Sequence, residues 1–524
     1  MRENLGDKYL AKARRLSEVN EIYEVTSLSE ALFPGSHCPL FGALLAIRQI
    51  KGAAVLIVGS DECTYYAKIM AMQSKEFGEQ AEFCYSLVLE EQDVSFGCQE
   101  KLTKAVKEIH SSSHFEVIFV VTTCLVELIG DDLESVCWQL EDELNIDLPL
   151  VHTEHFKCEN HLPGLERVLE SCAQLMREPE SPMQSTGKRI NLLGHRHGDF
   201  DSSELAEFLR RAGIDTHLVL PSEATIAQLR DAAQVEMNLV TDVIGLPLAK
   251  AMKTKFDIPY LYFDRFVTPE TIAETYDKLL DRLVTGADEG LRAELEKWLV
   301  QRLAEVKEKE SRLREKLVGT SFIYGNTPLL PLEFIAYLTE LGLLPKLVQL
   351  SRFSDEDLIY KERILKKADP YVTKNANIAP LQSIYDILQP SFYFGHEFAA
   401  RLRQKGIILM AMDRLGKFYG YQLTENLLDY LTEGLEARAK LLAEQESAGA
   451  MDGEVMMAAM AGMGHPSGQA SGHPGAMPQA KKPAGHPGGH PGGYPGRSPH
   501  GMEIKESKEL TGVRLASVRS KKED

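Results

Sequence analysis

GAAVLIVGS (residues 52–60) and EVIFVVTTC (residues 116–124) are the two stretches that decide the fold. Each is a short run of β-branched and apolar residues, and each is followed by a polar segment with helical periodicity. DLPLVHT (147–153) continues the series and precedes the helical pattern of residues 162–178. Strands that alternate with helices in this way predict a parallel sheet covered by helices on both faces.

The same alternation recurs twice more along the chain. Strands of a second unit are predicted at RINLLG (189–194), THLVLP (216–221), MNLVTD (237–242) and PYLYF (259–263). A long charged helix is predicted over residues 287–317. Strands of a third unit are predicted at TSFIYG (320–325), PKLVQLS (345–351), PSFYFG (390–395) and GIILMAM (406–412), before a closing helix over 422–446.

We therefore expect an α/β protein with three Rossmann-like, doubly wound parallel-sheet units around a central cleft. A chain of 524 residues exceeds the size at which one hydrophobic core keeps growing, which favours several domains. We assign residues 1–180 to the first unit, 187–290 to the second, and 291–446 to the long bridging helix and the third unit. Residues 447–524 are rich in glycine, proline and histidine, and we expect this tail to be disordered.

Composition narrows the classes of partner. The net charge of −19 argues against nucleic acid and anionic membranes, because lysine and arginine drive binding to phosphates. No run of about 18 apolar residues occurs, and the first residues lack the apolar core of a signal peptide, so we expect a cytoplasmic protein with no membrane partner. No G-x-x-x-x-G-K-[ST] motif is present for holding the phosphates of ATP.

All eight cysteines lie in the first 172 residues, and three of them stand at the mouths of predicted elements. Cys38 precedes a predicted helix, whereas Cys63 and Cys124 follow predicted strands. Because the carboxyl ends of parallel strands share one edge, Cys63 and Cys124 could converge there, and converging thiolates suit an iron–sulfur cluster. Their spacing lacks the compact C-x-x-C pattern, so from spacing alone ordinary burial is the better explanation.

Three stretches resemble a known family in their order and separation. HCPLFGALLAIRQIKGAAVLIVGSDECTYYAK (37–68), EEQDVSFGCQEKL (90–102) and VTTCLVELIGDDLESVC (121–137) are similar to the cluster-binding half of nitrogenase component 1 proteins. The resemblance covers most of residues 20–445, including DIPYLYFDRFVTPE (257–270) and MDRLGKFYGYQLTENLLDYL (412–431). The family includes molybdenum–iron protein subunits, their cofactor-assembly scaffold and tetrapyrrole reductases.

The resemblance implies a redox function. Cys38, Cys63 and Cys124 match the cysteines that hold the P-cluster, or its simpler [4Fe-4S] counterpart, at a subunit interface. The implied partners are a homologous component 1 subunit, in a dimer or tetramer, and a separate ATP-dependent iron protein. The implied function is an oxidoreductase subunit that relays electrons from the iron protein through the cluster to a cofactor or substrate pocket. The alternatives are a non-catalytic scaffold for assembly of a metal cofactor and a metal-storage or metal-delivery protein.

Other residues leave two explanations open. His152 and His155 could line the pocket that follows their strand in the family, and Cys98 stands where the family usually has glycine, so it could be an additional cluster ligand or fill space. His195 and His197 could face the central pocket or lie in a solvated turn, with Asp201 or Ser202 capping the next helix.

The cofactor-bearing subunits of the family hold their large metal cofactor through a cysteine of the second unit and a histidine of the third. Here no cysteine follows Cys172, and His396 is the only histidine of the third unit. The resemblance therefore implies that a further metal cofactor, if present, belongs to a partner subunit.

The histidines of the tail also leave two explanations open. His465, His473, His486 and His490 each precede a proline, and His500 follows one. They could bind transition metals weakly or form part of a soluble spacer.

Overall fold

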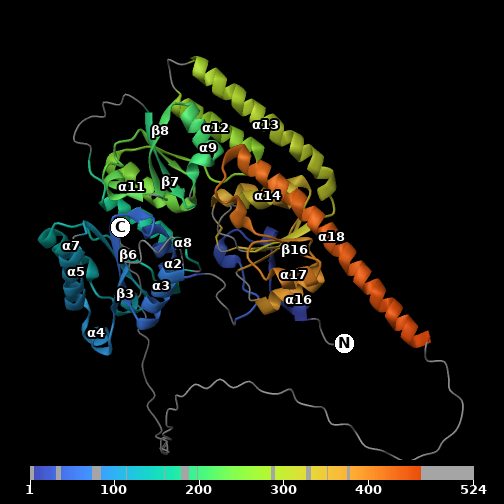
Figure 1. Ribbon diagram of the computed structural model, residues 1–524, viewed down its shortest axis with the longest axis horizontal. Coiled ribbons are helices and arrows are strands. Elements are labelled where there is room, and N and C mark those ends of the chain that lie inside the picture. Colours follow the sequence, from blue (N-terminus) through green and yellow to red (C-terminus); the bar gives the residue numbers. More distant parts are fainter. Residues whose placement is uncertain are drawn as a thin grey trace, which may run out of the picture. The chain divides into compact units, whose positions relative to one another are not determined.

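The computed structural model describes residues 5–30, 37–73, 84–113, 115–158, 160–178, 188–197, 199–222, 224–284, 289–325, 332–350, 352–353, 355–374 and 378–461. Within this part of the chain, three sheets built on parallel strands alternate with helices (Figure 1), which confirms the predicted fold class. The tail histidines at 465–500 lie outside the described residues.

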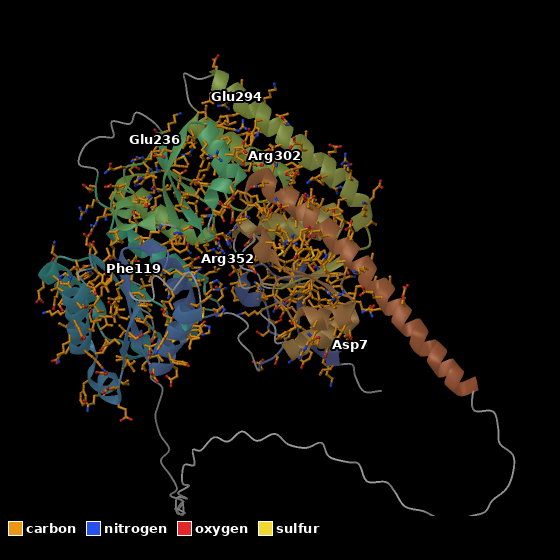
Figure 2. All side chains as sticks on the ribbon, in the orientation of Figure 1. Asp7, Phe119, Glu236, Glu294, Arg302 and Arg352 are labelled. Carbon is orange, nitrogen blue, oxygen red and sulfur yellow. The ribbon has the colours of Figure 1, made fainter. Side chains whose placement is uncertain are left out.

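The first sheet has the strand order β4-β3-β5-β6 and is parallel throughout. Its strands are β3 (Ala53–Gly59), β4 (Cys84–Val88), β5 (Val117–Thr122) and β6 (Leu150–His152). Val55 and Phe119 face a core that contains residues of helices α2 and α8, and Figure 2 labels Phe119. Leu56 and Val120 face a core that contains residues of α5 and α7. Both faces of β3 and β5 are therefore buried, which explains why their sequences are continuously apolar.

Helices and short 3₁₀ turns fill the connections of this first unit. They are α2 (Pro39–Ile47), α3 (Asp61–Gln73), α4 (Glu91–Phe96), α5 (Gln99–Ser113), α6 (Cys124–Ile129), α7 (Leu133–Leu144), η4 (His155–Lys157), α8 (Leu162–Ser171) and η5 (Cys172–Gln174).

Helices α2 and α8 approach each other through a pair of glycines. A Cβ atom on Gly42 would lie 1.9 Å from the carbonyl oxygen of His161, and one on Gly164 would lie 1.8 Å from that of Pro39. Only glycine permits this backbone contact, which fixes the first turn of α2, next to Cys38, against the start of α8.

Gly164→Ala is expected to destabilise the fold by about 1–3 kcal/mol or more, because either helix must shift to make room for the methyl group. Urea unfolding measures the loss. Gly290→Ala is the control: a Cβ there has no neighbour within 4 Å, and alanine favours the helix that contains it. Equal stability of the two variants would contradict the proposed contact.

The second sheet has the order β11-β10-β7-β8 and is also parallel. Its strands are β7 (Lys188–His195), β8 (Ile214–Pro221), β10 (Met237–Val240) and β11 (Tyr260–Tyr262), with α9 (Glu204–Arg211), α10 (Ile226–Arg230), α11 (Leu246–Phe256) and α12 (Pro269–Leu283) between and after them. Leu193 belongs to the core shared with the first sheet, and Leu192 to the core shared with the third. A two-stranded sheet of β2 (Ile50–Lys51) and β9 (Ala224–Thr225) adds a second link to the first unit.

In the first and second sheets the second strand along the chain lies at one edge, and the third strand pairs with the first. The order therefore reverses between β3 and β5 in the first sheet, and between β7 and β10 in the second. In open α/β sheets, the carboxyl ends of the strands beside such a reversal form the usual binding crevice.

The third sheet has six strands in the order β1-β14-β13-β12-β15-β16. Its parallel strands are β12 (Ser321–Tyr324), β13 (Leu344–Gln349), β14 (Tyr371–Thr373), β15 (Phe392–Phe394) and β16 (Ile408–Met410). The helical segments of this part are α13 (Glu289–Leu317), α14 (Leu332–Leu341), η8 (Asp355–Asp357), α15 (Leu358–Leu365), α16 (Ile378–Leu388), α17 (Ala399–Gln404), η9 (Met412–Leu415) and α18 (Gly420–Ala461). Helix α18 ends at Ala461, beyond the boundary that we expected at residue 446.

The amino-terminal segment packs on the third sheet, although we assigned it to the first unit. Strand β1 (Arg14–Arg15) pairs antiparallel with β14, and helix α1 (Leu5–Leu10) contacts α16. The Arg15 guanidinium lies 3.7 Å from the centre of the Tyr371 ring, and Ser17 Oγ donates to Asp369 at 2.8 Å. The sequence could not indicate that this segment pairs with β14, because a strand of only two arginines has no recognisable strand pattern.

Candidate iron–sulfur site

The structure brings together the three cysteines that the sequence singled out. Cys63 is the third residue of α3, directly after β3, and Cys124 is the first residue of α6, directly after β5. Strands β3 and β5 flank the reversal of strand order in the first sheet. Cys38 is the residue directly before α2. All three thiols are half-buried, as expected for groups at an edge that still faces outward.

The charges of these thiols act on one another. Burial raises the pKa of Cys38, and the negative charges of the Cys63 and Cys124 thiolates raise it further. The backbone amides of Leu40 and Phe41 hydrogen-bond the Cys38 thiol and oppose this rise in pKa. A bound cation would relieve the mutual repulsion of the three thiolates, so the arrangement favours metal binding.

A backbone amide also hydrogen-bonds the Cys124 thiol. The N–H of His155 donates to Cys124 Sγ at 3.1 Å. Hydrogen bonds to sulfur are one of the means by which proteins tune iron–sulfur clusters. Over the described part of the chain, no three histidine, cysteine or acidic side chains meet tightly enough to hold a single metal ion. Three half-buried thiols with amide donors fit a multi-iron cluster better, because each thiolate there binds a different iron.

Three other cysteines lie in the hydrophobic cores. Cys98 and Cys137 are buried on the α5 and α7 face of the first sheet, and Cys172 is buried on the opposite face. Burial raises the pKa of each of these thiols to about 12, which keeps them protonated and inert. The Cys98 N–H donates to Asp131 at 2.6 Å, so this position favours the space-filling explanation over the additional ligand.

Two further thiols are half-buried, yet neither is among the charges that raise the pKa of Cys38. Burial raises the pKa of Cys84 in β4 to about 11. Cys158 Sγ lies 3.8 Å from Nη2 of Arg167, a neighbour that the sequence did not predict.

His152 is the last residue of β6 and His155 begins η4, and the two residues bond different partners. The Nδ1 atom of His152 lies 2.7 Å from a carboxylate oxygen of Glu127. That hydrogen bond raises the pKa of His152, so its imidazole is charged over a wider pH range than usual. His155 contributes its backbone to Cys124, as described above. No sequence motif indicates that Glu127 bonds His152, because the two residues are 25 positions apart in the chain.

The loop after β6 is held by an arginine of α8. Arg167 donates to the carbonyl of His152 at 2.6 Å and to both carboxylate oxygens of the buried Glu154, at 2.8 and 3.2 Å. This paired hydrogen bond fixes the turn from which the His155 amide reaches Cys124.

The histidines of the later units lie elsewhere. His195 is fully buried, and its Nδ1 atom lies 2.8 Å from the hydroxyl oxygen of Tyr419, so the solvated-turn explanation is wrong for this residue. Ser203, rather than Asp201 or Ser202, caps α9. His396 is exposed, and its Nε2 atom lies 3.5 Å from Asp413.

Comparison with known proteins then decides the family. The model of the family described as nitrogenase component 1 type oxidoreductase matches residues 38–436. The chain belongs to this family.

Named relatives within the nitrogenase component 1 family fall into two groups. The chain is 27% identical over 239 residues to the nitrogenase iron-molybdenum cofactor biosynthesis protein NifE of Methanococcus maripaludis, covering 45% of this chain and 49% of the relative. It is 28% identical over 253 residues to the nitrogenase molybdenum-iron protein alpha chain of Clostridium pasteurianum, covering 46% and 45%. The matching region thus spans about half the length of these relatives.

The fold is shared with a solved nitrogenase structure. The structure titled "Nitrogenase Cp1 at pH 6.5" superposes with a TM-score of 0.64 at 18% identity, over 78% of this chain and 94% of that chain. None of the helices in the described ranges has the length and apolar character needed to cross a membrane.

Proposed function

We propose that this chain is a subunit of a nitrogenase-like reductase, which receives electrons from an ATP-dependent iron protein on an iron–sulfur cluster and passes them to a cofactor or substrate pocket. The observation that carries the proposal is the convergence of Cys38, Cys63 and Cys124 at the strand reversal of the first sheet. The family membership supports it independently. When bound, such a cluster supplies one-electron transfer.

Each residue of the site has a defined part in this function. The three thiolates would hold the iron, and their half-burial keeps the site within reach of a redox partner. The backbone amides of Leu40, Phe41 and His155 hydrogen-bond the sulfur atoms and stabilise their negative charge, and the sulfurs stay unprotonated. Arg167 positions the His155 amide through Glu154 and the carbonyl of His152.

Apolar residues exposed beside the thiols support a second subunit at this edge. Tyr65, Leu128 and Phe156 are 60%, 71% and 53% exposed, and they belong to α3, α6 and η4, the segments that carry Cys63, Cys124 and the His155 amide. Large exposed apolar side chains on the segments that carry the thiols are of the kind that a protein interface covers. A homologous component 1 subunit in a dimer or tetramer would cover them and complete the ligands of a P-cluster-like or [4Fe-4S] cluster.

A scaffold for assembling a metal cofactor is the second candidate. The similarity to NifE, whose name describes cofactor biosynthesis, favours it. A scaffold would release its metal cargo to an acceptor protein, whereas a reductase would keep its cluster through many turnovers.

The test uses the full chain purified anaerobically with its partner subunit. The oxidised complex is mixed with reduced iron protein, with and without MgATP, and followed by electron paramagnetic resonance. We expect the cluster signal to change only with MgATP, and the iron content to stay constant. Absence of any ATP-dependent reduction would overturn the reductase proposal, and transfer of the metal to an acceptor would favour the scaffold.

A further inference from the structure

Thr123 stands between the two strand ends that present Cys63 and Cys124. It follows β5 and directly precedes Cys124, and its backbone N–H donates to the carbonyl of Val58 in β3 at 3.1 Å. Its side chain is 2% exposed and lies against Gly59, the last residue of β3. A Cβ atom on Gly59 would overlap the Thr123 hydroxyl, so only glycine leaves room for this hydroxyl between the ends of β3 and β5.

The Thr123 hydroxyl is buried and unpaired. Within the described part of the chain, no donor or acceptor bonds its Oγ1 atom. Thr123 precedes the first residue of α6, where a threonine hydroxyl usually caps the first amides of a helix, but it makes no such bond. A buried hydroxyl without a partner costs free energy, so in a folded protein such a group is expected to bond a ligand or an ordered water.

The other buried threonines of the first unit, among its described residues, all have partners. Thr64 Oγ1 donates to a backbone carbonyl three residues earlier at 3.0 Å, and Thr153 Oγ1 donates to the carbonyl of Thr122 at 2.6 Å. Thr122 Oγ1 donates to the carboxylate of Glu127. These three hydroxyls therefore hold the chain itself together, whereas the hydroxyl of Thr123 remains available to a bound group.

The candidate cluster site is next to this hydroxyl, and its charge is negative. The thiolates of Cys38, Cys63 and Cys124 are close enough for the charges of the latter two to raise the pKa of Cys38. Backbone amides bond the sulfurs of Cys38 and Cys124, so the site already favours N–H donors. Thr123 adds an O–H group, which can donate to a sulfur that carries negative charge.

We propose that the Thr123 hydroxyl donates a hydrogen bond to a sulfur atom of the iron–sulfur cluster and thereby raises the reduction potential of the cluster. The inference rests on the proposed function, because it concerns the cluster at that same site. A donor favours the reduced cluster, which carries one more negative charge, so loss of the donor lowers the potential. Thr123 keeps its proton in both redox states and binds no iron.

The test is a redox titration of the anaerobically purified full chain with its partner subunit, followed by electron paramagnetic resonance. Thr123→Val removes the hydroxyl and keeps a side chain of similar size. We expect the reduction equilibrium to shift about tenfold toward the oxidised cluster, the scale of one hydrogen bond, which equals about 59 mV for one electron. Thr123→Ser keeps a hydroxyl and should stay close to the wild-type potential.

Thr153→Val is the matched control. Thr153 is also 2% exposed, but its hydroxyl already bonds a carbonyl, so this variant should leave the reduction potential unchanged. Electron nuclear double resonance of wild-type samples in H₂O and D₂O should show an exchangeable proton coupled to the cluster, and Thr123→Val should lose it. An unchanged potential in Thr123→Val, or an equal shift in Thr153→Val, would overturn the inference.

Urea unfolding of the cluster-free full chain examines the same hydroxyl without metal. Thr123→Val should raise the unfolding midpoint, because it removes an unpaired buried hydroxyl, whereas Thr153→Val should lower the midpoint, because it breaks a hydrogen bond. A lower midpoint for Thr123→Val would show that its hydroxyl has a partner within the protein, and would overturn the inference. A wild-type complex without iron would instead contradict the proposed function.

Discussion

Cys63→Ala is expected to strip the anaerobically purified protein of most of its iron and sulfide, and Cys38→Ala and Cys124→Ala should do the same. In the proposed cluster each thiol would bind a different iron, and neither of the other half-buried thiols is among the charges that raise the pKa of Cys38, so we expect neither to replace a lost ligand. Iron and sulfide determination, with electron paramagnetic resonance of the dithionite-reduced protein, measures the loss.

The matched control for these variants is Cys137→Ala. Cys137 is 2% exposed in the core between the first sheet and α7, so its removal should cost stability and leave the iron content unchanged. Cys98→Ala tests the additional-ligand explanation in the same way, and we expect it to keep its cluster. Unchanged iron in all three variants at Cys38, Cys63 and Cys124 would refute the candidate site.

Glu204→Ala should have the largest effect on stability, a loss of about 3–5 kcal/mol, the usual cost of breaking one side of a buried ion pair. The Glu204 side chain is 3% exposed and bonds Arg302 Nε at 3.1 Å (Figure 2 labels Arg302). It also accepts from the first amides of α18, at Tyr421 and Gln422, over 2.8 and 3.1 Å. Its loss would leave the half-buried Arg302 with Glu305 and Glu425 as its remaining partners, and would remove the acceptor of the α18 amides at the contact of α9, α13 and α18. The midpoint of urea unfolding measures the effect.

Two comparisons sharpen this prediction. Glu305→Gln removes an exposed partner of the same arginine, so we expect a change within about 1 kcal/mol. Glu204→Gln keeps an oxygen that accepts from the α18 amides and should fall between the other two variants. A loss for Glu204→Ala no larger than that for Glu305→Gln would show that the ion pair does not hold these helices together.

The sequence was most informative where structure depends on neighbouring residues. The strands around Val55 and Phe119 are apolar on both faces, and their prediction as buried parallel strands is confirmed. The position of Cys63 and Cys124 at one edge followed from parallel topology alone. Strands β4 and β14 escaped prediction because CYSLV and YVT are short and mix polar with apolar residues, so their pairing depends on neighbouring strands.

Sequence patterns could not predict hydrogen bonds between polar residues that are far apart in the chain. Tyr419 pairs with His195 across 224 positions, and Glu204 with Tyr421 across 217. Neither pair shows a characteristic spacing or motif in the sequence, because the residues of each pair meet only through packing of separate parts of the fold. Sequence patterns likewise did not predict that Arg196 and Arg265 both bond the buried Asp242, because arginines in loops are usually solvated.

The amino-terminal strand sets an order of events during synthesis. Arg15 leaves the ribosome early, yet its hydrogen-bond partner Asp369 follows 354 positions later. The segment that leads to Cys38 therefore cannot be anchored on the third sheet until most of the chain has emerged, because a non-local pairing forms only once both partners exist. Iron supplied to a nascent chain would meet Cys63 and Cys124 on a folded first sheet before the segment preceding Cys38 is fastened. We therefore expect loading of the proposed cluster to follow translation.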